Sequence, residues 1–129
     1  MTKLLKLSLA ALAASTGAAT AAPVLAHGGD HPMHGGQVLL VGETAFELVG
    51  KPAGAELYVV EDGDDIAAAG YTAKLTVDAA GKKTDYVAAP AGGNRFVAEG
   101  AKLPKGAKVG VLLINTQSKA RQMATFAIK

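Results

Sequence analysis

The chain has 129 residues, enough for one domain, and carries 13 basic and 11 acidic residues for a formal net charge of +2. It contains no cysteine, which excludes a disulfide framework and thiolate ligands for a metal. With two arginines, no tryptophan and balanced charges from residue 27 onward, it lacks the basic clustering of a nucleic-acid-binding protein, so we expect no nucleic acid as partner.

Residues 1–26 have the pattern of an export signal peptide. Lys3 and Lys6 precede the apolar run LSLAALAA, which is too short to span a bilayer, and small neutral residues follow it. Cleavage is expected after Ala26, with Ala21 as the alternative position. We therefore expect a protein of the periplasm that has no contact with the membrane once the signal is removed.

Short apolar runs separated by turn residues begin after Gly36. The first three are QVLLV, TAFELV and AELYVVE, and in the second run Phe46 and Leu48 share one face while Glu47 lies on the other. The clearest alternation is YTAKLTVD, which places Tyr71, Ala73, Leu75 and Val77 on one side. A period of two residues predicts half-buried antiparallel strands.

The same pattern continues to the end of the chain. AAGKKT and PAGGN read as turns around the strands DYVAA and RFVAEG, AKLPKGAK as a longer connection, and VGVLLINT and RQMATFAIK as the last two strands. We predict an all-β domain over residues 37–129, an immunoglobulin-like antiparallel β-sandwich of about seven strands. A small β-barrel is the alternative.

The two halves of the chain differ in charge. Residues 27–70 hold eight acids and one base, whereas residues 71–129 hold ten bases and three acids. The acidic turn EDGDDI lacks the spacing and the final glutamate of a calcium loop, so we interpret it as a solvated hairpin tip. We expect the two halves to pair within the fold, although an acidic half also attracts cations.

All three histidines of the chain lie in the stretch AHGGDHPMHGGQV. Glycine and proline interrupt this stretch repeatedly and disfavour a helix, so residues 27–36 are predicted to form a flexible segment. It offers three imidazoles, a thioether and a carboxylate, and the candidate metal ligands are His27, Asp30, His31, Met33 and His34. Copper is the expected ion, with zinc, nickel and silver as alternatives. A glycine-rich linker without a metal role is the other interpretation.

The stretch HPMHGG, followed by AFELVG and AELYVVEDGDD, resembles small exported proteins of bacterial heavy-metal resistance. It is also similar to the β-sandwich segment of some periplasmic adaptor subunits of RND-type heavy-metal efflux pumps. The resemblance covers residues 31 to about 78. It implies periplasmic metal binding through His31, Met33 and His34, with an efflux adaptor as partner. The family motif C-P-M-H-P has a cysteine and a second proline that this chain lacks, which leaves the metal's identity open.

An enzyme is not expected. Ser118 is the one serine beyond the predicted signal, and no histidine lies outside the N-terminal segment, so no catalytic triad can be assembled on the domain. The leading hypothesis is a periplasmic metal-binding protein that acts as carrier, buffer or accessory to heavy-metal efflux. The alternative is a non-catalytic β-sandwich interaction module that docks on an envelope or efflux complex and has no metal role.

Overall fold

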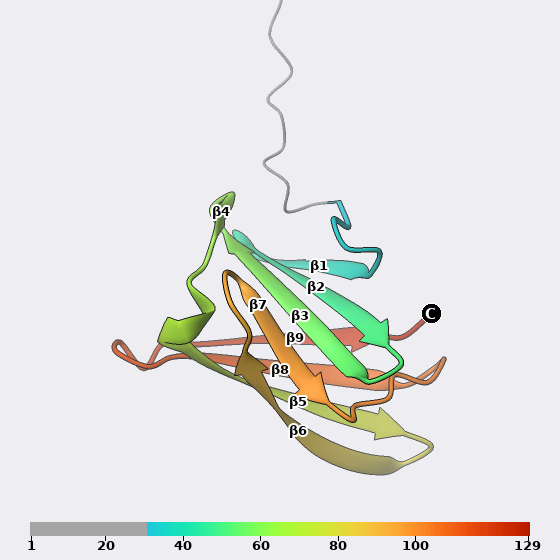
Figure 1. The fold of residues 1–129 in the computed structure, drawn as a ribbon. Coiled ribbons are helices and arrows are strands. Elements are labelled where there is room, and N and C mark those ends of the chain that lie inside the picture. The colour runs from blue at the N-terminus through green and yellow to red at the C-terminus, as the bar shows by residue number, and fades with distance from the viewer. Residues whose placement is uncertain (1–30) are drawn as a thin grey trace, which may run out of the picture.

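The structure is a computed structural model that describes residues 31–129 (Figure 1). The predicted signal peptide and two of the candidate metal ligands, His27 and Asp30, lie outside the described residues. Within residues 31–129 no helix has the length and apolar character needed to cross a membrane.

The described part of the chain is built from strands, with one short 3-10 helix, η1 (Ala68–Gly70). Each apolar run predicted from the sequence forms a strand, whereas η1 and the two-residue strand β4 were not predicted. The strands are β1 (Gln37–Val41), β2 (Thr44–Lys51), β3 (Gly54–Glu61), β4 (Asp64–Asp65), β5 (Tyr71–Ala79), β6 (Lys82–Pro90), β7 (Arg95–Glu99), β8 (Lys108–Asn115) and β9 (Arg121–Ala127).

The strands form one antiparallel sheet in the order β1-β2-β3-β7-β6-β5-β8-β9, with β4 paired to β3. Most of β6 pairs with β5, but its last residues, Ala89 and Pro90, pair with β7. The sheet therefore folds over at β6, so that β1, β2, β3 and β7 face β5, β6, β8 and β9 (Figure 1).

The side chain of Gln37 joins the two ends of this sheet. The Gln37 amide nitrogen at the start of β1 donates a hydrogen bond of 2.9 Å to the carbonyl oxygen of Ala127 at the end of β9. The Gln37 amide oxygen accepts a second one, of 3.0 Å, from the backbone N–H of Lys129. The result is a nearly closed, barrel-like antiparallel sheet.

The prediction of an all-β fold is confirmed, and the barrel-like closure corresponds to the architecture that the sequence left as the alternative. The immunoglobulin-like sandwich is not confirmed. Period-two alternation reports which face of each strand is buried, and that face is the same in a sandwich and in a flattened barrel. The difference depends on how the sheet edges meet, as they do here through Gln37.

The inward faces of both layers meet in one core. All three phenylalanines of the chain lie there, and Phe46, Leu57, Leu75, Phe96 and Val109 are completely buried. The alternation read from the sequence is confirmed in β3, β5 and β9, whose inward positions are buried while their neighbours are more exposed. The core rests on small aliphatic side chains and these three aromatic rings.

Strand β2 departs from this alternation, because residues 44–49 are buried on both faces. Phe46 and Leu48 point into the core, whereas Glu47, on the outer face, is only 6% exposed. A charged side chain is rarely buried unless it is paired. Glu47 is covered by residues 31–36, which we call the histidine segment.

The Gln37 bridge yields a first prediction. Replacing Gln37 by alanine removes two hydrogen bonds that hold β1 to β9, and we expect a loss of about 1 kcal/mol because both are solvent-exposed. That loss lowers the melting temperature by about 4–8 °C, measurable by circular dichroism. Gln117→Ala is the control, since its side chain bonds to no other described residue. An equal melting temperature for Gln37→Ala and Gln117→Ala would contradict this closure.

Candidate functional site

Two glycines allow the histidine segment to lie against the outer face of β2. Gly35 has a φ of +77°, in the left-handed region that glycine adopts without strain. At Gly36, a Cβ atom would overlap the carbonyl oxygen of Leu48 and lie 2.7 Å from the Cγ2 atom of Val49. The sequence His-Gly-Gly therefore serves a close approach between this segment and the sheet.

The carboxylate of Glu47 is the centre of the contact. Its Oε1 atom accepts a hydrogen bond of 3.0 Å from the backbone N–H of Met33. Its Oε2 atom accepts two more, of 2.8 Å from the N–H of His34 and 3.0 Å from that of Gly36. The fourth contact joins Oε1 to the Nδ1 atom of the His34 ring at 2.9 Å. Burial alone would raise the pKa of Glu47, but the bonds from His34 and the backbone amides lower it below 4.5.

The imidazole of His34 also stacks on an aromatic ring. Its centroid lies 3.5 Å from that of Tyr58, and the two rings are within 6° of parallel. Tyr58 is the β3 residue directly opposite Glu47 in the strand register, so both contacts of His34 come from one cross-strand pair. The His34 side chain remains 40% exposed.

Further polar contacts hold Tyr58 in place. Its hydroxyl donates a hydrogen bond of 2.8 Å to Glu56, and the Arg95 guanidinium donates one of 2.7 Å to the other oxygen of that carboxylate. The bond from Arg95, followed by that from Tyr58, lowers the pKa of Glu56. Burial, followed by the bond to Glu56, raises the pKa of Tyr58. The outer face of β2, β3 and β7 thus carries a continuous polar network that ends at His34.

A cavity of about 410 Å³ opens beside this network. Residues of the segment, of strands β1 to β3 and of the hairpin between β3 and β4 line it. Its lining residues are His31, Met33, His34, Val38, Ala45, Phe46, Glu47, Tyr58, Val60, Gly63, Asp65 and Asn94.

The structure thus brings together three of the five ligands proposed from the sequence. His31, Met33 and His34 line the same cavity, and the Met33 side chain is 69% exposed. Among residues 31–129, no group of three or more His, Cys, Asp or Glu side chains is arranged to hold a metal ion.

Glu47 is the functional residue that the sequence analysis missed. The alternation places Glu47 on the outer face of its strand, and that placement is correct. The side chain is nevertheless buried there and not solvated. The available signal was an isolated acid between Phe46 and Leu48, thirteen residues after His34, in a run that is otherwise apolar. Alternation alone does not distinguish this position from an ordinary exposed glutamate.

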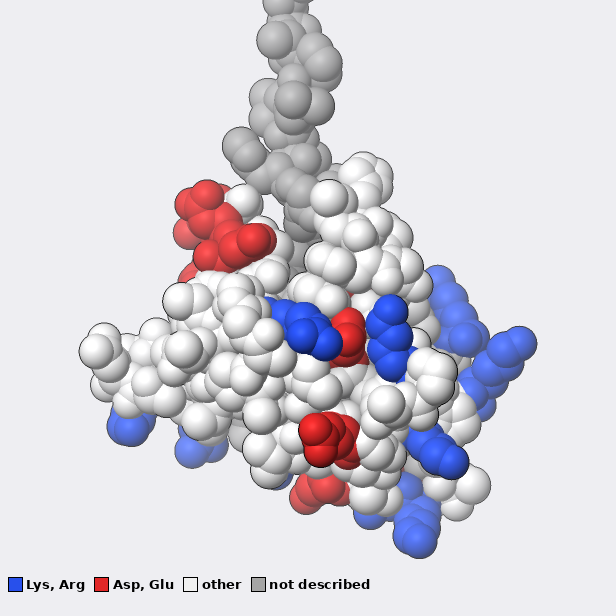
Figure 2. All heavy atoms as spheres, viewed as in Figure 1, with Lys and Arg blue, Asp and Glu red and all other residues white. Residues whose placement is uncertain are grey.

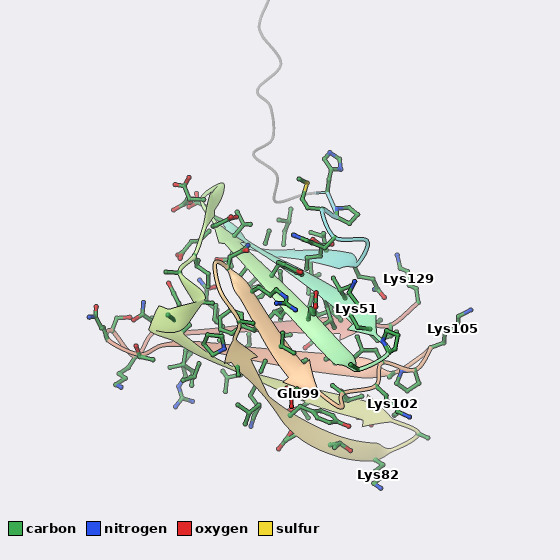
Figure 3. The ribbon with its side chains drawn as sticks, viewed as in Figure 1. Lys51, Lys82, Glu99, Lys102, Lys105 and Lys129 are labelled. Carbon is green, nitrogen blue, oxygen red and sulfur yellow. The ribbon has the colours of Figure 1, made fainter. Side chains whose placement is uncertain are left out.

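The expected pairing between acidic and basic halves is found at one place among the described residues, the ion pair of Glu56 with Arg95. Five other acids gather at the turns next to the cavity, where the carboxyl of Asp62 raises the pKa of Glu43 (Figure 2). This acidic tip consists of Glu43, Glu61, Asp62, Asp64 and Asp65. Lysines gather at the opposite end of the sheet (Figure 3). The turn between β1 and β2 and the turn between β3 and β4 lie at the same end of the sheet, and both are acidic. The strand directions therefore place these acids at one end and the lysines at the other.

Comparison of the sequence with protein-family models gives no match, and the comparisons with curated proteins and with solved structures give none either. The description of the site therefore rests on its geometry.

The close approach at Gly36 leads to a second prediction. In the Gly36→Ala variant the new methyl group meets backbone atoms of β2, so we expect a loss of about 1–3 kcal/mol and faster hydrogen exchange at the amides that bond to Glu47. Gly70→Ala is the matched control, because a Cβ atom there meets nothing within 4 Å. Unchanged exchange at the His34 amide in Gly36→Ala would refute the docked arrangement.

Proposed function

We propose that this chain is a periplasmic metal-binding protein whose cargo is copper. The observation that carries the proposal is the shared cavity: the imidazoles of His31 and His34 and the thioether of Met33 line one solvent-accessible space on a rigid sheet. His27 and Asp30 are proposed as further ligands from the adjacent part of the segment.

The donor set supports copper over hard cations. Imidazole is a borderline ligand that suits copper, zinc and nickel, and a thioether adds preference for cuprous copper and silver. Magnesium and calcium prefer oxygen ligands. The Glu47 oxygens already accept hydrogen bonds from the segment, so nitrogen and sulfur are the donors that the segment itself presents.

The surroundings of the cavity suit the capture and release of a cation. The acidic tip lies beside it, and Asp65 forms part of the lining, so a positive ion is attracted toward the segment. Met33 and His34 are both substantially exposed, which allows a partner to approach a bound ion. We therefore propose a role as carrier, buffer or accessory to heavy-metal efflux, with a periplasmic adaptor as partner and no catalytic activity.

The two exposed methionines provide the test of this function. Met33→Leu removes the thioether at the cavity, and we expect cuprous copper to bind about tenfold more weakly, or about 1.4 kcal/mol. Met123→Leu is the matched control, since Met123 is 71% exposed against 69% for Met33 and lies on β9 away from the cavity. The affinity is measured by competition with a chromogenic cuprous chelator.

A variant with alanine in place of His27, His31 and His34 gives the decisive comparison. If the wild type binds copper, silver, zinc and nickel no more tightly than this variant does, the proposal is overturned. Equal copper affinities of Met33→Leu and Met123→Leu would remove Met33 from the ligand set.

A second candidate function, a docking module, is favoured by the lysine end of the molecule. Five exposed lysines gather there, two of them from the connection between β7 and β8, with Glu99 among them (Figure 3). In the described part of the chain none of them forms an ion pair, although Lys51 lies near enough to Glu56 to help lower the pKa of that carboxyl. These lysines are Lys51, Lys82, Lys102, Lys105 and Lys129.

The docking function predicts that this end binds acidic surfaces. The double variant Lys102→Gln/Lys105→Gln should elute from immobilised poly-glutamate at a lower salt concentration than the wild type, because attraction between exposed charges is screened by salt. Lys74→Gln/Lys119→Gln removes the same net charge elsewhere and is the control. Equal elution of both double variants would show that net charge, and not this surface, determines the binding.

A further inference from the structure

We propose that Glu47 is a positioning residue that holds His34 in the Nδ1–H tautomer, so that Nε2 is the atom that binds the metal. The inference deepens the proposed function and rests on it for the metal. The tautomer of His34 is a property of the metal-free protein and can be measured without any metal.

The tautomer follows from the hydrogen bonds around the carboxylate. Three backbone N–H groups, which can only donate, point at the Glu47 oxygens. An ionised carboxylate has only acceptors to offer, and the Nδ1 atom of His34 lies 2.9 Å from Oε1. The nitrogen must therefore carry the proton in this contact, and in a neutral imidazole the lone pair is then on Nε2.

Tyr58 fixes the orientation of the ring. With the ring centroids 3.5 Å apart and the rings nearly parallel, the imidazole is stacked on the ring of Tyr58. Rotation of the ring by half a turn would bring a carbon atom toward Glu47 and lose the bond at Nδ1. Carboxylate and aromatic ring together leave His34 with one nitrogen for coordination, on the side of the ring away from Glu47.

The arrangement is the one by which proteins orient metal-binding histidines in general. A carboxylate that accepts the second ring N–H fixes the tautomer and makes the ligating nitrogen more basic, and its loss typically costs about 10–100-fold in metal affinity. Here the same carboxylate also bonds to the amides of Met33 and Gly36. Glu47 therefore positions the neighbouring thioether together with the imidazole.

The substitution Glu47→Gln tests both the tautomer of His34 and the metal affinity. It preserves the shape of the side chain but replaces one acceptor oxygen by an amide group that donates. If that group faces Nδ1, the preferred tautomer of His34 becomes Nε2–H. We expect nitrogen NMR of the metal-free protein, recorded where the spectrum shows a neutral ring, to show Nδ1–H in the wild type and a shift toward Nε2–H in the variant. We expect its affinity for cuprous copper to fall about 10–100-fold.

Two controls separate positioning from loss of charge or of fold. Glu99→Gln removes one negative charge at the opposite end of the sheet and should leave both the tautomer and the copper affinity unchanged. In a His34→Ala background Glu47→Gln should lose most of its effect on copper, because residues that act through one another are not additive. The wild-type tautomer needs no variant, so a failure of Glu47→Gln to fold leaves the proposal testable.

Each outcome is decisive. An Nε2–H tautomer in the wild type overturns the inference, and so do equal copper affinities of the wild type and Glu47→Gln, while the proposed function stands. If the wild type shows Nδ1–H but binds no metal, the proposed function is overturned, and the metal role of Glu47 falls with it.

Discussion

A buried carboxylate on the outside of the sheet is the constraint on which the functional half of this structure depends. Glu47 is 6% exposed, and an ionised acid in such a place is stable only if strong donors surround it. The segment before β1 supplies three amides and an imidazole, and no buried side-chain polar atom is left without a partner in the described residues. The need of one side chain for hydrogen bonds thus places His34 and Met33 at the cavity.

The strand directions add an electrostatic division to this local arrangement. The turns next to the cavity are acidic, and the connections at the other end carry unpaired lysines (Figures 2 and 3). The two ends therefore differ in electrostatic character, and the partners that we propose for them differ accordingly, a cation at the first and an acidic surface at the second. A carrier that docks through its lysine end would keep the proposed metal-binding segment away from the docked surface.

Much of the fold was predictable because strand formation is reported locally. Leu57 and Val59, or Ala124 and Phe126, alternate with more exposed neighbours, and each pair is buried as that pattern predicts. The short strand β4 and the helix η1 were missed because two or three residues are too few to show a period. His31, Met33 and His34 were found because they concentrate unusual ligand chemistry within four residues, whereas Glu47 has no local mark that separates it from a solvated acid.

The sequence by itself determined the all-β class, the positions of the main strands, the inward face of each, and the clustering of every histidine before the first strand. These properties depend on neighbours within a few positions of one another. Tertiary structure alone decided the barrel-like closure through Gln37, the burial of Glu47 and the separation of acids from lysines. Each of these depends on residues far apart in the chain, such as Gln37 and Ala127, which meet only when the sheet has folded over at β6.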